Sequence, residues 1–368
     1  MKLNFNRNSL SEALGLLTLV VPSRTPQPIL RCVRITADAK NVRLCATDLE
    51  VGINYLVREV EIEQPGEIVV PADSFAGVVR ESVDEVLSLE AEEGICRITG
   101  ADSHFTIYGQ EAGQYPIVPG FDGDGDIEIS LGNLQAGIKQ CLFATAKEST
   151  RYALNGVLWE IKGKKLSLIA TDGRRLARSR VDLASAPGEK IAKANIIVPA
   201  KTMVLLDKLG GGDKDSVLVK LVDNQVLISW ADVVISSGLI EGNFPKYEDI
   251  IPKDYDKKLT LSTEAVLSAA RRAALLTSEE SRGIRIAIGK ETIVFSGKAP
   301  ETGDAQVEMG VDYKGEPIEI GFNPQFLIDA LRVIQAAEFE LELGQPDRPG
   351  LIKSGANFLY VLMPINLG

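Results

Sequence analysis

The sequence predicts an α+β fold in which one type of domain is built three times. Two observations support this prediction. Short motifs recur 119 to 129 residues apart along the 368-residue chain, and the same order of helix-forming and strand-forming segments surrounds each motif. Solenoid proteins repeat every ~20–50 residues, whereas each unit here is long enough to hold its own hydrophobic core.

The recurring motifs divide the chain into three nearly equal parts. Polar segments at 121–126 and 252–258 separate these parts, so the predicted domains are residues 1–127, 128–256 and 257–368. The motifs are Ala46-Thr47-Asp48 and Ala170-Thr171-Asp172; Ile68–Ala72, Ile196–Ala200 and Ile320–Pro324; and Tyr115-Pro116, Phe244-Pro245 and Met363-Pro364.

Each domain is expected to begin with an amphipathic helix, because apolar residues recur three and four positions apart. In the first domain, Ser9 and Glu12 also have the spacing of a capping box. The apolar faces consist of Leu10, Ala13, Leu14, Leu17 and Val21 in the first domain, Leu134, Ile138, Cys141, Leu142 and Thr145 in the second, and Val266, Ala270, Ala273 and Ala274 in the third.

Short segments rich in β-branched residues follow these helices and predict strands. A second helix is expected after the second recurring motif, over Asp73–Arg80, Lys201–Leu209 and Gln325–Ile334. Each domain then holds two helices and roughly eight short strands, which is an α+β pattern. The predicted strands include Val33–Ile35, Val42–Cys45, Gly52–Val57, Gly156–Ile161, Lys165–Ile169, Ile284–Ile288 and Thr292–Phe295.

The composition excludes several classes of protein. Hydrophobic residues make up 45% and charged residues 25% of the chain, so wholesale disorder is excluded. The apolar stretch Leu14–Val21 is too short for a membrane span and lacks a cleavage site, so we expect a cytoplasmic protein. The net charge of −11 argues, taken alone, against a nucleic-acid partner.

The residues that usually bind metals are few and scattered. The single histidine, His104, has no partner histidine, and we expect it at an edge or an interface. The cysteines have no C-x-x-C spacing, so we expect core thiols and no metal site. They are Cys32, Cys45, Cys96 and Cys141.

No motif for a cofactor or for catalysis is present either. The glycine patterns of dinucleotide-binding and phosphate-binding loops are absent. Asp122, Asp124 and Asp126 resemble the start of an EF-hand loop, but Ile127 replaces the required glycine and Asn133 the bidentate glutamate. We therefore expect a solvated linker there, with no cofactor and no enzymatic activity.

The most specific patterns in the chain lie in three places. They are Arg151–Val157 with Ala170–Ala177, Glu241–Tyr247 running on to Pro252, and Tyr360–Leu367; Arg24 with Pro28–Leu30 and Arg282–Arg285 add further landmarks. Together with the threefold repeat, these segments resemble the DNA polymerase III β subunits of bacteria, the sliding clamps, over the whole length of the chain.

The resemblance implies a ring. In this family three DNA-clamp domains, each with two helices and two small antiparallel sheets, form a crescent. Two crescents join head to tail into a six-domain ring around double-stranded DNA. The clamp is a processivity factor without a catalytic site, and an ATP-driven clamp loader opens it. The resemblance therefore implies a homodimer that binds DNA topologically and needs no cofactor.

The ring implies a basic lining, because contacts to phosphates carry no sequence information and permit sliding. Most of the candidates lie on or near predicted helices, and Arg24, Arg151 and Tyr152 lie in loops at a ring face. For each, an ordinary surface role is the alternative. The expected DNA-binding residues are Arg7, Arg24, Arg80, Lys139, Arg151, Tyr152, Lys201, Arg271, Arg272 and Arg332.

The family also implies a groove for short linear peptides of the replicative polymerase α subunit, the clamp loader, other DNA polymerases and repair proteins. Apolar side chains suit an adaptable peptide site, although a core position is the alternative for each of them. The matching positions are Leu154, Thr171, Gly173, Arg174, Arg175, Leu176, Pro245, Ile250, Val361, Met363, Pro364 and Ile365. Arg174, Asp249 and Asn366 depart from common family residues, which alters the charge of the rim.

For ring closure, the family places Leu275 and Leu276 of one copy against Phe105 and Ile107 of the other. The acidic run Glu81–Glu93 is then expected on the outer surface. Two other classes of function remain as alternatives: a repeat-built enzyme with a substrate groove, for which no polar constellation is evident, and a scaffold protein that uses only the peptide groove.

Overall fold

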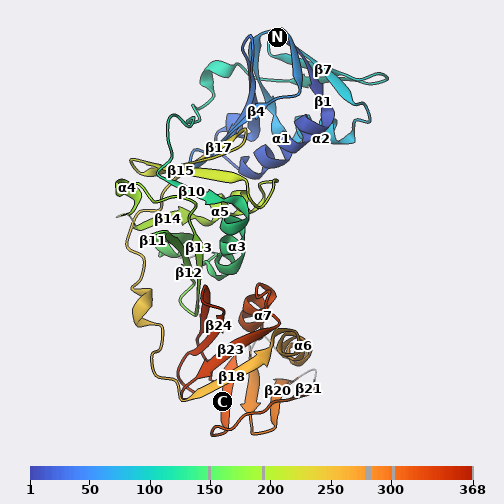
Figure 1. The fold of residues 1–368 in the computed structure, drawn as a ribbon. Coiled ribbons are helices and arrows are strands. Elements are labelled where there is room, and N and C mark those ends of the chain that lie inside the picture. Colours follow the sequence, from blue (N-terminus) through green and yellow to red (C-terminus); the bar gives the residue numbers. More distant parts are fainter. Residues whose placement is uncertain (148–150, 193–194, 278–282, 301–302, 367–368) are drawn as a thin grey trace. The chain divides into compact units, whose positions relative to one another are not determined.

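The computed structural model describes residues 1–368 apart from 148–150, 193–194, 278–282, 301–302 and 367–368 (Figure 1). The described part of the chain forms two compact units. One consists of residues 1–132, 183–194 and 201–239, and the other of residues 133–182, 195–200 and 240–368. No helix in the described ranges is long and apolar enough to cross a membrane.

The first unit contains two antiparallel sheets. The smaller has the strand order β5 (Val60–Gln64), β1 (Lys2–Asn6), β7 (Val86–Glu92), β8 (Ile95–Thr99) and β9 (His104–Tyr108). The larger has the order β10 (Ile127–Ser130), β15 (Ser216–Val222), β16 (Gln225–Trp230), β17 (Val233–Gly238), β4 (Val51–Val57), β3 (Val42–Thr47), β2 (Cys32–Ala37) and β6 (Gly66–Pro71).

The second unit repeats this plan. Its larger sheet has the order β14 (Asn195–Pro199), β11 (Gly156–Lys162), β12 (Lys165–Thr171), β13 (Arg175–Asp182), β25 (Phe358–Leu362), β24 (Gly350–Ser354), β23 (Glu338–Leu343) and β18 (Lys257–Ser262). The smaller sheet has the order β21 (Gly303–Gly310), β20 (Thr292–Ala299), β19 (Ile284–Ile288) and β22 (Ile318–Phe322).

Each eight-stranded sheet joins two neighbouring sequence repeats. In the first unit β17, the last strand of the second repeat, pairs with β4 of the first repeat, and Ile235 lies opposite Ile53. In the second unit β25, the last strand of the third repeat, pairs with β13 of the second, and Tyr360 lies opposite Ala177. The boundary between the two compact units therefore lies within the second repeat. The predicted α+β architecture is confirmed, and strand pairing rather than a linker alone connects the repeats.

Two helices of each outer repeat pack as a pair. Helix α1 (Arg7–Val20) contacts α2 (Ala72–Glu81), and α6 (Thr263–Ala274) contacts α7 (Pro324–Arg332) (Figure 1). The helices α3 (Leu131–Cys141), α4 (Glu189–Ala192) and α5 (Ala200–Asp207) belong to the middle repeat. The predicted apolar faces are confirmed, since Leu10, Leu14 and Leu17 and the other main members are buried; Val21 and Thr145 lie just beyond their helices.

The predicted capping box at Ser9 is wrong. Helix α1 begins at Arg7, three residues earlier than a cap at Ser9 implies, and Asn6 caps it, accepting hydrogen bonds from the backbone N–H groups of Asn8 and Ser9 at 3.0 and 3.1 Å. The Ser9 hydroxyl instead donates to Glu59 at 2.7 Å. Asparagine is as good a helix N-cap as serine, and the strand β1 leads directly into it.

The first recurring motif forms the same turn in both repeats. The Thr47 hydroxyl donates to the Val51 carbonyl at 3.0 Å and accepts from the Leu49 N–H, and the Asp48 carboxylate accepts from the N–H of Val51 at 2.7 Å. Such side-chain bonds replace the backbone partners that a tight turn leaves unsatisfied. The repetition of Ala-Thr-Asp therefore records a hairpin turn and does not by itself indicate a binding site.

The four cysteines carry free thiols. Cys32, Cys96 and Cys141 are buried, and Cys45 is half-buried, as expected for core thiols. Burial raises the pKa of Cys45 to about 11 and that of Cys96 to about 12, which keeps both protonated and unreactive at neutral pH.

Candidate functional site

The centre of the predicted groove is the turn between β12 and β13. The Thr171 hydroxyl donates to the Arg175 carbonyl at 2.6 Å and accepts from the Gly173 N–H at 3.1 Å. The Asp172 carboxylate accepts from the N–H groups of Arg174 and Arg175 at 2.9 and 3.1 Å. This network fixes the backbone and leaves the Arg174 side chain exposed at the rim.

The glycine at position 173 is explained by its backbone conformation and not by a lack of space. A Cβ added here would meet nothing within 4 Å. Its φ of +87° explains the glycine, because a residue with a side chain adopts this backbone conformation only with strain. Leu49 occupies the equivalent position of the first repeat with a φ of 78°.

Arg175 is engaged on every side within the second unit. Its guanidinium donates to Asp172 at 3.0 Å, to Asp329 at 2.8 Å and to the Phe143 carbonyl at 2.6 Å, and it stacks over the Phe326 ring at 4.2 Å. Burial opposes its charge, but the hydrogen bond with Asp329 and the nearby anionic groups outweigh this effect, so its pKa lies above the usual value. Arg175 therefore holds α7 and the turn together, and Arg174 is the rim cation.

An apolar cluster forms the floor beside this turn. Leu176 of β13 pairs with Val361 of β25, and both are buried. They belong to a cluster with Leu158, Ile169, Ile197, Tyr247, Leu351 and Leu359, against which Ala153, Ile240, Phe244, Ile251 and Tyr255 pack. Leu154 and Pro245 adjoin members of this cluster in the chain, so the cluster and its neighbours account for four of the predicted groove residues.

Two predicted groove residues expose apolar surface above this floor. Ile250, whose N–H donates to the Tyr247 carbonyl, is 39% exposed, and Met363, whose N–H donates to the Arg174 carbonyl at 3.0 Å, is 38% exposed. Most large aliphatic side chains of the protein are buried. Partly exposed apolar side chains at the edge of a buried cluster are typical of a peptide-binding site.

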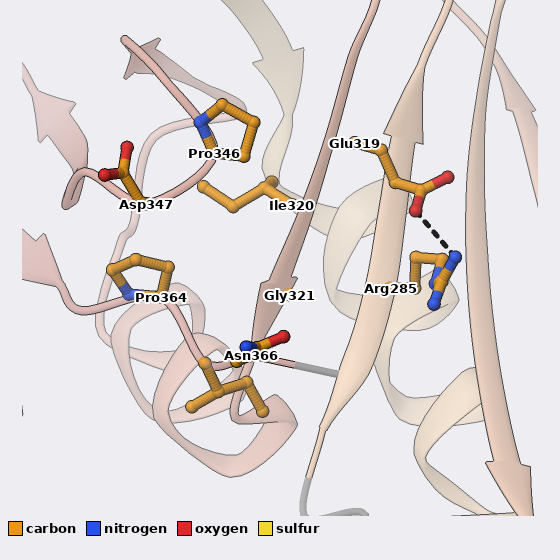
Figure 2. Close-up of a pocket in the computed structure, with 9 residues that line it drawn as sticks. Arg285, Glu319, Ile320, Gly321, Pro346, Asp347, Pro364 and Asn366 are labelled. Carbon is orange, nitrogen blue, oxygen red and sulfur yellow. Dashed lines mark hydrogen bonds and ion pairs between the residues drawn. The ribbon is translucent and has the colours of Figure 1, made fainter. Parts of the chain in front are cut away.

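A pocket of about 580 Å³ lies beside the C-terminal residues of the site (Figure 2). Pro364 and Ile365 line it, and the Ile365 N–H donates to the Gly321 carbonyl at 2.9 Å. Arg285 and Glu319 form an ion pair of 2.6 Å at its opposite wall. The sequence analysis did not identify this charged wall.

Most of the predicted DNA-binding cations lie in the last turn of a helix. These are Arg80 of α2, Lys139 of α3, Arg271 and Arg272 of α6, and Arg332 of α7, and all are exposed. The negative end of the helix dipole favours cations at this position, which is an alternative reason for their presence. The shared position nevertheless gathers positive charge at one end of each helix.

The remaining predicted DNA contacts differ in their surroundings. Arg24 and Arg151 are exposed in loops, and Tyr152 is 73% exposed. Arg7 opens α1 and donates to Asn8 at 2.7 Å. Lys201 on α5 donates to the Val20 carbonyl at 2.8 Å and forms an ion pair with Asp48, so its ammonium already has protein partners.

Two of the predicted interface residues lie on the edge strand of one smaller sheet, and the other two follow a helix that contacts the edge strand of the other smaller sheet. Phe105 and Ile107 are on β9, an edge strand, with Phe105 37% exposed and Ile107 buried. Leu275 is 78% exposed at the end of α6, and Leu276 follows it, half-buried. Helix α6 contacts β21, the edge strand of the other smaller sheet. His104 is exposed on β9, as expected of an edge residue.

Comparison with known proteins identifies the family. Models of the N-terminal, central and C-terminal domains of the DNA polymerase III beta subunit match residues 1–119, 128–246 and 248–366. The chain belongs to the DNA polymerase III beta subunit family.

Relatives and solved structures of this family match the whole chain. The beta sliding clamps of Pseudomonas putida and Caulobacter vibrioides are 30% and 31% identical over 100% of both chains. The sliding clamp of Bacillus subtilis superposes with a TM-score of 0.93 at 28% identity, covering 100% of this chain and 99% of that chain. A Pseudomonas aeruginosa sliding clamp bound to griselimycin superposes with a TM-score of 0.92 at 30% identity, covering 100% of both chains.

Sequence reasoning missed the residues that support the turn at the centre of the predicted groove. Asp329 and Phe326 contact Arg175 from α7, 154 and 151 positions away in the chain, and no local pattern links them. Asp172 lies inside the segment Ala170–Ala177 and could have been found there. Among the described residues, no group of three or more His, Cys, Asp or Glu is arranged to hold a metal ion.

Proposed function

We propose that the chain acts as a sliding clamp, the non-catalytic processivity factor of a DNA polymerase. Two copies close into a ring around duplex DNA in the cytoplasm, and a peptide groove tethers the replicative polymerase, the clamp loader and repair proteins. Residues 1–127, 128–256 and 257–368 are its three clamp domains. The single observation that carries the proposal is the way in which successive repeats are joined by strand pairing, twice within this chain.

The joints leave one matched pair of strand edges free. In the first joint the last strand of a repeat, β17, adds to β4, and in the second β25 adds to β13. By the same rule, β9, the last strand of the first repeat, should pair with a strand of a preceding repeat. That strand is the one that corresponds to β4 and β13. That equivalent is β21 of the third repeat, and both β9 and β21 are sheet edges. A second copy supplies the missing repeat at each end.

The internal pairings also predict the register of this joint. Each of β4, β13 and β21 pairs with the strand that precedes it in its own repeat. The residues that lie opposite the same position of that preceding strand are Ile53, Ala177 and Ala305, so these three residues are equivalent. Phe105 corresponds in the same way to Ile235 and Tyr360. Since Ile235 pairs with Ile53 and Tyr360 with Ala177, Ala305 is expected opposite the partner subunit's Phe105. The neighbouring pair is then Asp304 with the partner subunit's Thr106.

A disulfide across this joint tests the register. Both Thr106 and Asp304 are exposed on the free edges, so a chain carrying Thr106→Cys and Asp304→Cys is expected to form covalent dimers on oxidation. The measurement is the mass on a non-reducing gel, about twice 39.8 kDa. The matched control combines Thr106→Cys with Glu308→Cys. Glu308 lies on β21, four residues from Asp304 and therefore out of register with Thr106. Equal cross-linking of the control would show that the register is wrong.

The peptide groove is supported by the exposed Ile250 and Met363 above the apolar cluster and by the rigid turn at Thr171. An apolar cleft with a few fixed polar groups accepts short, partly disordered peptides, which bind through one or two apolar anchors. Arg174 gives this rim a positive charge, which favours peptides with acidic residues beside the anchors.

Topological binding is the property that separates this function from its alternatives. We expect clamps loaded by the clamp loader and ATP to stay on circular DNA through gel filtration and to leave when the DNA is cut once, because linear DNA lets a ring slide off. The same mass of DNA is compared before and after cutting. Equal retention on both would rule out encirclement, and no retention on either would favour a scaffold or an enzyme instead.

A further inference from the structure

A pocket of about 320 Å³ lies between the segment that follows the peptide groove and the larger sheet of the second unit. Residues Ile251–Lys253 and Tyr255 form one wall, and strands β13, β18, β23, β24 and β25 form the other. Four cations and one carboxylate line it. They are Arg178, Lys253, Lys258, Lys353 and Glu342.

The single carboxylate is already neutralised. Glu342 is 3% exposed and forms ion pairs with Lys258 at 3.0 Å and Lys353 at 2.8 Å. Burial disfavours its charged form, but the hydrogen bonds from Lys353 and Lys258 outweigh this effect and lower its pKa. Glu342 is therefore a fixed anion with two partners, and the pocket retains an excess of positive charge.

Two buried donors in the pocket have no acceptor in the part of the chain that the structure describes. The Arg178 Nε and the Tyr255 hydroxyl are each shielded from solvent, and neither has a hydrogen-bond partner among the described residues. Both side chains line the pocket. A buried donor without an acceptor is costly, so two such donors at one pocket indicate that an acceptor belongs there.

The acids near Arg178 do not supply this acceptor. Glu160 accepts from the Tyr247 hydroxyl at 2.9 Å and pairs with Lys162 at 3.2 Å, and Glu248 pairs with Lys162 at 3.5 Å. Arg180 lies close enough to Arg178 to oppose its charge. The nearby acids therefore compensate the charge of Arg178 only weakly, and its Nε–H has no acceptor among the described residues.

We propose that this pocket binds an oxyanion, a phosphate or a carboxylate. The Arg178 Nε–H and the Tyr255 O–H donate to its oxygens, and Lys253, exposed at the mouth, adds charge. An oxyanion satisfies both donors and the excess charge at once, whereas a neutral ligand satisfies only the donors and a cation is repelled. The bound ion links the segment 251–255 to the sheet beneath it. The proposal does not depend on the function of the chain as a clamp.

The test measures thermal unfolding of the full chain in sodium phosphate, sodium acetate and sodium chloride at equal ionic strength. A ligand that binds only the folded state raises the unfolding temperature in a saturable way. We expect phosphate or acetate to raise it above the chloride value. A larger response to phosphate identifies a tetrahedral anion as the ligand, and a larger response to acetate identifies a carboxylate.

Variants separate binding from general salt effects, because phosphate also stabilises proteins by exclusion from their surfaces. Arg178→Met is expected to remove the difference between oxyanion and chloride. In sodium chloride the Arg178→Met chain should unfold at a temperature no lower than that of the parent chain, since the substitution removes a buried donor that has no acceptor among the described residues. Tyr255→Phe should weaken anion affinity about tenfold. Lys253→Ala should also weaken it, whereas Lys164→Ala, an exposed lysine elsewhere in the same unit, should not.

Two results would overturn the proposal. One is an equal unfolding temperature of the parent chain in all three salts. The other is a saturable oxyanion response that survives in both Arg178→Met and Tyr255→Phe, which places the ion elsewhere. If Arg178→Met does not fold, Tyr255→Phe and Lys253→Ala decide the question, because neither removes a partly buried charge.

Discussion

A chain carrying Leu275→Lys is expected to run as a monomer of 39.8 kDa, where the parent chain runs at about twice that mass. Leu275 is 78% exposed at the end of α6, so a lysine there costs the isolated chain almost nothing. At the proposed joint it is buried against the partner, and an unpaired buried charge weakens association about a hundredfold or more. Sedimentation or light scattering at micromolar concentration measures the change.

The control for this substitution is Ile117→Lys, which adds the same charge at another highly exposed apolar residue, 90% exposed and beside β4 and β17 rather than β9 or β21. It should remain a dimer. Leu275→Lys should also lose retention on circular DNA, because half of a ring cannot encircle a duplex. A Leu275→Lys chain that stays dimeric and retains circular DNA would show that ring closure occurs elsewhere.

The second large effect concerns the groove. Removing residues 363–368 is expected to abolish stimulation of the polymerase while leaving the dimer intact. The deletion removes the exposed Met363 and the wall formed by Pro364 and Ile365, but no part of β9, β21 or α6. Primer extension on circular single-stranded DNA measures stimulation, and sedimentation measures the dimer.

The deletion also removes two backbone hydrogen bonds, from Met363 to Arg174 and from Ile365 to Gly321, so point variants complement it. Ile250→Asp with Met363→Asp changes only partly exposed side chains and should weaken peptide binding about a hundredfold, because two apolar anchors carry most of such an interaction. Leu49→Asp with Ile117→Asp, both exposed in the other unit, is the control. Unchanged polymerase stimulation in the groove variants would contradict the site.

The sequence was informative where structure is local. The helix faces and most strand positions follow from the spacing of apolar residues. The cap of α1 was assigned to the wrong residue, because Asn6, Ser9 and Glu12 all suit a helix N-terminus and only the path of β1 decides between them.

Contacts between distant segments could not be predicted from the residues alone. The pairing of β17 with β4 and the ion pair of Arg175 with Asp329 join positions more than 150 residues apart. For the same reason, Arg174 and Arg175 were both expected among the groove residues, with nothing to distinguish them. The structure distinguishes them, because one is exposed at the rim and the other is surrounded by acceptors and aromatic rings.

The net charge of −11 was a poor guide to partners, because it sums the whole surface. The acidic side chains between Glu81 and Glu93 are largely exposed, while exposed cations gather in the last turns of α2, α3, α6 and α7. We expect the two signs to lie on different faces of the ring. A negative or neutral potential along its inner surface would contradict this expectation.

The strand joints have a consequence for how such a ring opens and how long it persists. At β17–β4 and β13–β25 the two edges belong to one polypeptide, so after a transient separation they meet again at an effective concentration of about millimolar. The proposed joint between β9 and β21 has no such tether. When it parts, the edges rejoin only through the remaining joint or by diffusion. Of the six joints in a closed ring, the two without a tether are therefore the ones that open. Their lifetime sets the residence time of the clamp on DNA.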